Sequence, residues 1–132
     1  MTDSPQKALK EAEAWVVSAK HTLVDAQSEE ALAGVACAQA IHGIIRANDA
    51  LMLHFFKVKP TRHDDAPLGF AKLVRENKVL KEDERFKNLV SSAMRDKSGA
   101  DYGKQVFSYD DGKEYVEKSE EFVTAVKKYV RT

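Results

Sequence analysis

Three ionisable side chains lie on one line of a long predicted helix between Ala31 and Lys57: His42, Arg46 and Asp49. They follow one another at steps of four and three residues, which keep side chains on one face of a helix. An imidazole, a cation and a carboxylate in one groove could bind a ligand phosphate, a charged residue of a partner or a second copy of the chain. The alternative interpretation is structural, with Arg46 and Asp49 paired one turn apart beside His42.

The helix that carries these side chains is otherwise apolar. Large residues such as Ile41, Ile44 and Leu51 fill one broad arc, and small residues fill a second arc. A helix covered on two sides is typical of the centre of a bundle. Asn48 falls within the large apolar arc, so we expect its amide to bond a buried backbone group or a partner helix. Two glycines are expected to allow close helix packing, Gly34 and Gly43.

The rest of the chain also follows a helical period, and no strand pattern or internal repeat interrupts it. Ser4 with Pro5, Ser28, and Ser108 with Asp111 are typical helix N-termini, the last resembling a capping box. Gly99 is expected to end a helix. The predicted fold is all-α, an antiparallel four- to five-helix bundle with a long central second helix. The expected helices run over about 5–25, 28–57, 66–77, 84–97 and from 108 onward.

Composition limits the classes of function. The 132 residues suit a single helical domain, 1–132, and 21 basic side chains balance 21 acidic ones. Any contact with nucleic acid must therefore be local. The single Cys37 excludes an intramolecular disulfide and a cysteine-based zinc site. Because no long apolar segment or signal peptide is visible, we expect no membrane contact and a cytoplasmic location.

No sequence motif of the common enzyme classes is present, so neither a cofactor nor a metal is expected. His63, with Asp64 and Asp65 beside it, is more typical of a helix cap and a solvated charge cluster than of a metal site. Arg95 lies opposite the apolar stripe of its helix and should face water or a second subunit. Asp101 and Tyr102 follow where that helix ends, and helix ends often carry function.

Two segments resemble the HEPN domain family (higher eukaryotes and prokaryotes nucleotide-binding). AQAIHGIIRANDALMLHFFKVKPTRHDD is similar to the family's alanine-rich helix, which reads roughly A-x-x-A-x-H-A-x-x-A-x-x-A-L-L before a Lys/Pro-Thr-His loop. MRDKSGADYGKQVFSYDDGKEYVEKSEEFVTAVKKYV is similar to its R-x-x-A-D-Y-G stretch and Ser-capped last helix. With five helices in the right order, the resemblance covers nearly the whole chain.

The resemblance implies a helical homodimer, often encoded beside a minimal nucleotidyltransferase, that binds nucleotides or RNA in a toxin–antitoxin or stress-related pair. Carried over by position, it implies roles in a ligand site or dimer cleft for His42, His63, Arg95, Asp101 and Tyr102. Arg46 and Asp49, which share the helix line with His42, complete the set of candidates.

Many family members are metal-independent ribonucleases with an Arg followed, after four to six residues, by a His. Here Arg95 is followed by Asp101 and Tyr102 and by no His. Because such cleavage needs a group that exchanges protons near neutral pH, we expect binding rather than catalysis. Two alternatives stay open. One is a ribonuclease that pairs Arg95 with His42 or His63, and the other is a purely structural helical interaction module.

Overall fold

The computed structural model describes residues 3–58 and 65–130. Within these residues lie five α-helices and no strand, which confirms the predicted all-α bundle. The α-helices are α1 (Pro5–Ala26), α2 (Leu32–Phe56), α3 (Asp65–Arg75), α4 (Phe86–Asp101) and α5 (Tyr109–Lys127), with a 3-10 turn, η1 (Lys81–Asp83), before α4.

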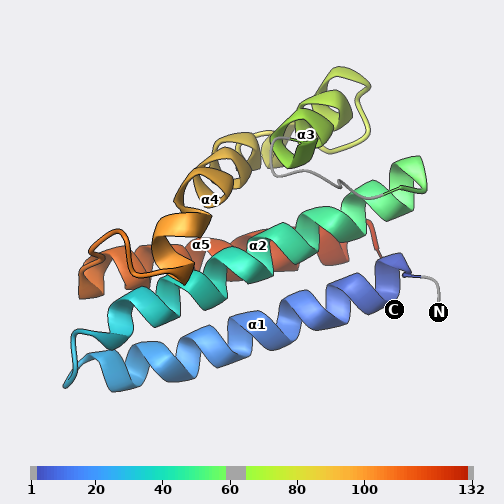
Figure 1. The fold of residues 1–132 in the computed structure, drawn as a ribbon. Coiled ribbons are helices and arrows are strands. Elements are labelled where there is room, and N and C mark those ends of the chain that lie inside the picture. Colours follow the sequence, from blue (N-terminus) through green and yellow to red (C-terminus); the bar gives the residue numbers. More distant parts are fainter. Residues whose placement is uncertain (1–2, 59–64, 131–132) are drawn as a thin grey trace.

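Helix α2 occupies the centre, as its two covered arcs predicted. In Figure 1, α1 runs antiparallel beside α2, α5 lies behind α2, and α4 runs obliquely away from them toward α3. The large arc is buried at Ile41, Ile44 and Leu51. The small arc lets α1 come close: a Cβ on Gly43 would lie 3.1 Å from Val16 Cγ2. Gly34 has no atom within 4 Å of such a Cβ, so the prediction of close packing at Gly34 is wrong.

Serine side chains cap the N-termini of α1 and α5. The Ser4 hydroxyl accepts a hydrogen bond from the Lys7 amide, and Ser108 and Asp111 form the predicted capping box. The prediction for α2 was wrong: this helix begins at Leu32, with no side-chain cap, because the Ser28 hydroxyl instead donates to the Asp25 carbonyl oxygen at the end of α1.

Helix α4 ends about one turn later than predicted, at Asp101. Gly99 lies inside it, and the left-handed residue that follows the helix is Gly103, with φ 65°. The Tyr102 amide still bonds the Ser98 carbonyl at 3.1 Å. Asp101 therefore belongs to the helix, which holds its carboxylate next to α2.

Phe70 and Leu73 of helix α3 are buried, and the Phe70 ring packs edge-on against Phe122 of α5, with ring centroids 6.1 Å apart. The Asn48 amide donates to the Ala66 carbonyl at 3.4 Å, so the expected bond to a buried backbone group is confirmed. Among the described residues, no helix combines the length and apolar character that crossing a bilayer requires.

Candidate functional site

Two candidate residues far apart in sequence meet in the bundle. His42 Nε2 on α2 lies 3.0 Å from Asp101 Oδ1 on α4. Lys97, one turn before Asp101, donates to the second oxygen of the same carboxylate at 3.1 Å. From α1, the Trp15 ring stacks on the imidazole, with centroids 4.8 Å apart and planes inclined by 23°. We call Trp15, His42, Lys97 and Asp101 the His42 cluster.

The His42 cluster is partly open to solvent and holds an ionised carboxylate. Burial of Asp101 favours its neutral form, but the hydrogen bond from Lys97 and the interaction with His42 outweigh burial and lower its pKa. The His42 side chain is 30% exposed, so a ligand can reach the ring. A carboxylate that holds one ring nitrogen orients the imidazole, and the other nitrogen can then form a hydrogen bond or exchange a proton.

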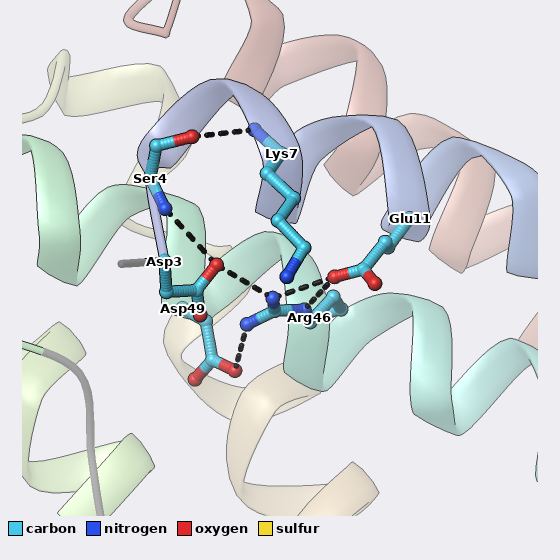
Figure 2. A network of polar contacts seen from close by, with 6 residues as sticks. All are labelled: Asp3, Ser4, Lys7, Glu11, Arg46 and Asp49. Carbon is cyan, nitrogen blue, oxygen red and sulfur yellow. Dashed lines mark hydrogen bonds and ion pairs between the residues drawn. The ribbon is translucent and has the colours of Figure 1, made fainter. Parts of the chain in front are cut away.

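Arg46 and Asp49, the other two members of the predicted line, are engaged within the chain. Figure 2 shows the Arg46 guanidinium among three carboxylates: Asp3 at 2.9 Å, Glu11 at 2.7 Å from Nε, and Asp49 at 3.0 Å. Hydrogen bonds to these three carboxylates outweigh the effect of burial and raise the pKa of Arg46. The predicted pairing of Arg46 with Asp49 is confirmed, and ligand binding by either residue stays a prediction.

Arg95 and Tyr102 lie on the surface. The Arg95 side chain is 72% exposed, which confirms that it faces away from the core, and it donates to Asp96 from Nε at 3.2 Å. Tyr102 is 73% exposed, and Lys104 Nζ lies 5.6 Å from the centroid of its ring. An exposed ring with a neighbouring cation is suited to stacking on a base.

Asp96 is a second carboxylate of α4 with two side-chain partners, and it was not among the residues predicted from the sequence. It is buried, and it accepts hydrogen bonds from Arg95 and from the Tyr115 hydroxyl of α5. Burial would raise the pKa of Asp96, but these bonds lower it, whereas burial and the bond to Asp96 raise the pKa of Tyr115. The Asp96 carboxylate and the Tyr115 hydroxyl thus link α4 to α5, with Asp96 ionised and Tyr115 protonated.

The structure thus brings some of the predicted site residues into contact and leaves others apart. His42 meets Asp101, Arg46 meets Asp49, Arg95 and Tyr102 are exposed, and His63 lies outside the described residues. Sequence reasoning missed Lys97, although its spacing of four residues from Asp101 could have indicated the pair. It also missed the contact of Trp15 with His42, for which the sequence carries no direct signal.

In the part of the chain that the structure describes, no group of three or more His, Cys, Asp or Glu side chains could hold a metal ion. Cys37 is buried, and burial raises the pKa of its thiol to about 12. No model of a protein family matches the chain, and no curated protein matches it.

Proposed function

We propose that this chain is a HEPN-like homodimer that binds a nucleotide or an RNA at the surface formed by the His42 cluster and the C-terminal end of α4. The observation that carries the proposal is the contact between His42 and Asp101. These residues belong to the two segments that resemble the family, and 59 positions separate them in the sequence. Their contact supports one composite site in place of two unrelated polar patches.

The side chains around this contact have the chemistry that nucleotide binding needs. Tyr102 offers an exposed ring for stacking, and Lys104 lies beside it. Arg95 is exposed enough to turn from Asp96 toward a phosphate, for which a guanidinium is a bidentate donor. Lys97 brings a further cation to the carboxylate that holds His42. The surface therefore combines stacking with phosphate contacts.

The resemblance extends the proposal to partners. A homodimer would bring two such surfaces into one assembly, and a minimal nucleotidyltransferase in a toxin–antitoxin or stress-related pair is the further partner that the resemblance implies. Light scattering with and without ATP and a short RNA measures the mass of the protein and of its complexes. A monomer that binds neither ATP nor RNA would contradict the proposal.

Arg95→Ala tests the surface itself. We expect this variant to weaken binding of a fluorescent RNA by about tenfold, the cost of a charged hydrogen-bonding pair. Arg85→Ala is the matched control, because Arg85 is also exposed, also pairs with a carboxylate and lies before the other end of α4. If Arg95→Ala changed neither the mass nor RNA binding, the site would not be at this surface.

A metal-independent ribonuclease is the second candidate, and the orientation of His42 by Asp101 favours it. An oriented imidazole can accept and donate protons in RNA cleavage without a metal. The test is to incubate RNA with the protein in excess chelator and to measure cleavage of the RNA. Cleavage that is lost in His42→Ala and retained in His21→Ala, where the histidine is exposed, would establish this activity. Equal residual cleavage in both variants would indicate a contaminating nuclease.

A further inference from the structure

A long groove runs along α5 and separates it from the side of α4 that carries Asp96 and, farther along, from η1. A hollow of about 270 Å³ and another of about 290 Å³ share Leu89, Ser92, Glu114 and Lys118, and the second meets a hollow of about 570 Å³ at Arg85. The lining of α5 extends from Asp111 to Lys128, roughly 25 Å along a helix. Figure 1 shows why: α4 runs obliquely to α5, so the two helices diverge.

The groove is acidic in a chain that is neutral overall. Seven carboxylates and four cationic side chains line it, an excess of three negative charges. The cations are already engaged by carboxylates of the groove. Arg95 pairs with Asp96 at 3.2 Å, Arg85 and Lys118 with Glu121 at 3.4 and 3.8 Å, and Lys128 with Asp83 at 2.9 Å. Each of these cations thus has a carboxylate partner in the groove, and Arg95, at one end of the groove, is the one that the nucleotide proposal has turning away from its partner.

Glu114 lies near the end of this groove that Asp111 lines, and no cation among the described residues pairs with it. It is exposed, lines both of the smaller hollows, and forms no ion pair or hydrogen bond with any described residue. Asp111 uses its Oδ2 atom for the Ser108 amide, which leaves its other oxygen able to accept. These carboxylate oxygens favour a ligand that brings positive charge.

The spacing of the acidic groups indicates what kind of cation fits. The carboxylates follow the length of the groove, and no set of them among the described residues could hold a metal ion. Between them lie apolar groups, including Leu89, Phe107 and Ala125. The alkyl stems of lysine and arginine pack on apolar groups while their charged ends reach acceptors.

We propose that the groove between α4 and α5 binds a lysine- and arginine-rich polypeptide segment of a partner protein. This site lies on a different side of α4 from the bond between His42 and Asp101, and Arg95, which lines one end of the groove, is the one residue named in both proposals. The peptide proposal rests on the acidic groups of the groove and not on the nucleotide proposal. A segment of about 16 residues in a helix, or about eight in an extended conformation, spans the groove.

The probe is a labelled synthetic peptide of about 16 residues in which lysine and alanine alternate. Its binding is measured by fluorescence anisotropy at about 50 mM salt. We expect Glu114→Lys to weaken binding of the peptide by about tenfold, because it replaces an uncompensated acceptor with a repelling charge. Glu117→Lys is the matched control: it makes the same change of charge on the same helix, but Glu117 is exposed and does not line the hollows. We expect less than about a twofold effect there.

Several outcomes would overturn the proposal. One is equal weakening by both variants, which would indicate a general charge effect. Another is equal binding of a peptide with glutamate in place of lysine. If spermine bound as tightly as the peptide, the ligand would be a small polyamine and not a polypeptide. If Glu114→Lys changed the mass of the protein in light scattering, the groove would be a contact between copies of the chain.

Discussion

At the scale of single residues, Arg46 is the charge whose removal should cost the most stability. Its side chain is 17% exposed and contacts Asp3, Glu11 and Asp49, so replacing it leaves partly buried carboxylates without their cation. We expect Arg46→Gln to lower the free energy of unfolding by about 3 kcal/mol in urea titrations. Arg85→Gln, which breaks an exposed pair, should lower it by less than about 1 kcal/mol. Equal losses would mean that the network around Arg46 is not stabilising.

Asp101 should make the stability of the fold depend on pH in a predictable direction. Its pKa in the folded chain lies below the ordinary value of about 3.9, so folding favours its ionised form. Its contribution is therefore complete above about pH 5 and is lost as the pH falls through the lowered pKa. Asp101→Asn should be less stable than the parent chain at pH 6, and the difference should shrink below about pH 4 in urea titrations. A difference that stayed constant down to pH 2 would contradict this assignment, because that pH lies well below the pKa of about 3.9 of a free carboxyl.

The same residues show how far a site can be predicted from the sequence. The pairs Arg46 with Asp49 and Lys97 with Asp101 lie one helical turn apart, so helical geometry alone could indicate them. The bond from His42 to Asp101 depends on how α4 crosses α2, and no local spacing encodes that crossing. Local pairs are therefore predictable, whereas the composite site requires the tertiary structure.

At the scale of helices, the cap of α5 could be predicted and the end of α4 could not. Ser108 and Asp111 stand at the fixed spacing of a capping box. Gly99 could equally end a helix or lie inside one, and the choice was decided by Gly103, which supplies the left-handed turn. A glycine thus permits a helix end without requiring one.

The capping box of α5 should have a measurable effect on stability. The Ser108 hydroxyl accepts a hydrogen bond from the Asp111 amide at 3.1 Å. Ser108→Ala removes that acceptor and should lower the free energy of unfolding by about 1 kcal/mol, measured by thermal or urea denaturation. Ser108→Asp supplies another acceptor at a helix N-terminus and should recover most of the loss. If the aspartate variant were as unstable as the alanine variant, the side-chain cap would not be the cause.

The two glycines of α2 should respond oppositely to the same substitution. Gly34→Ala adds a Cβ where no atom lies within 4 Å, so the gain in helix propensity should raise stability by roughly 0.5 kcal/mol. Gly43→Ala places a Cβ 3.1 Å from Val16 Cγ2 and 3.4 Å from the Ala12 carbonyl oxygen. We expect it to lower stability by roughly 1 kcal/mol, because α1 must shift. Thermal unfolding of both variants compares them directly, and equal shifts would mean that α1 does not depend on this close approach.

At the scale of the whole molecule, the balance of 21 basic and 21 acidic side chains hides an uneven distribution. The groove between α4 and α5 has an excess of carboxylates, whereas Lys97 and Lys104 lie near the C-terminal end of α4, and Arg95 lies where the two surfaces meet. Separate surfaces of opposite charge can serve ligands of opposite charge on one small bundle. Overall composition could not reveal this, because it averages over the surface.

This distribution predicts a shallow salt dependence for RNA binding at the proposed surface. Each cation that contacts a phosphate of single-stranded RNA contributes about −0.7 to the slope of log K against log salt, so three cations give a slope of about −2. Lys104→Ala should make the slope shallower by about 0.7, and Lys113→Ala, an exposed lysine on α5, should leave it unchanged. Anisotropy titrations of a short labelled RNA at several salt concentrations measure all three slopes. A slope steeper than about −4 would require more phosphate contacts than these cations can make, and would place RNA elsewhere on the molecule.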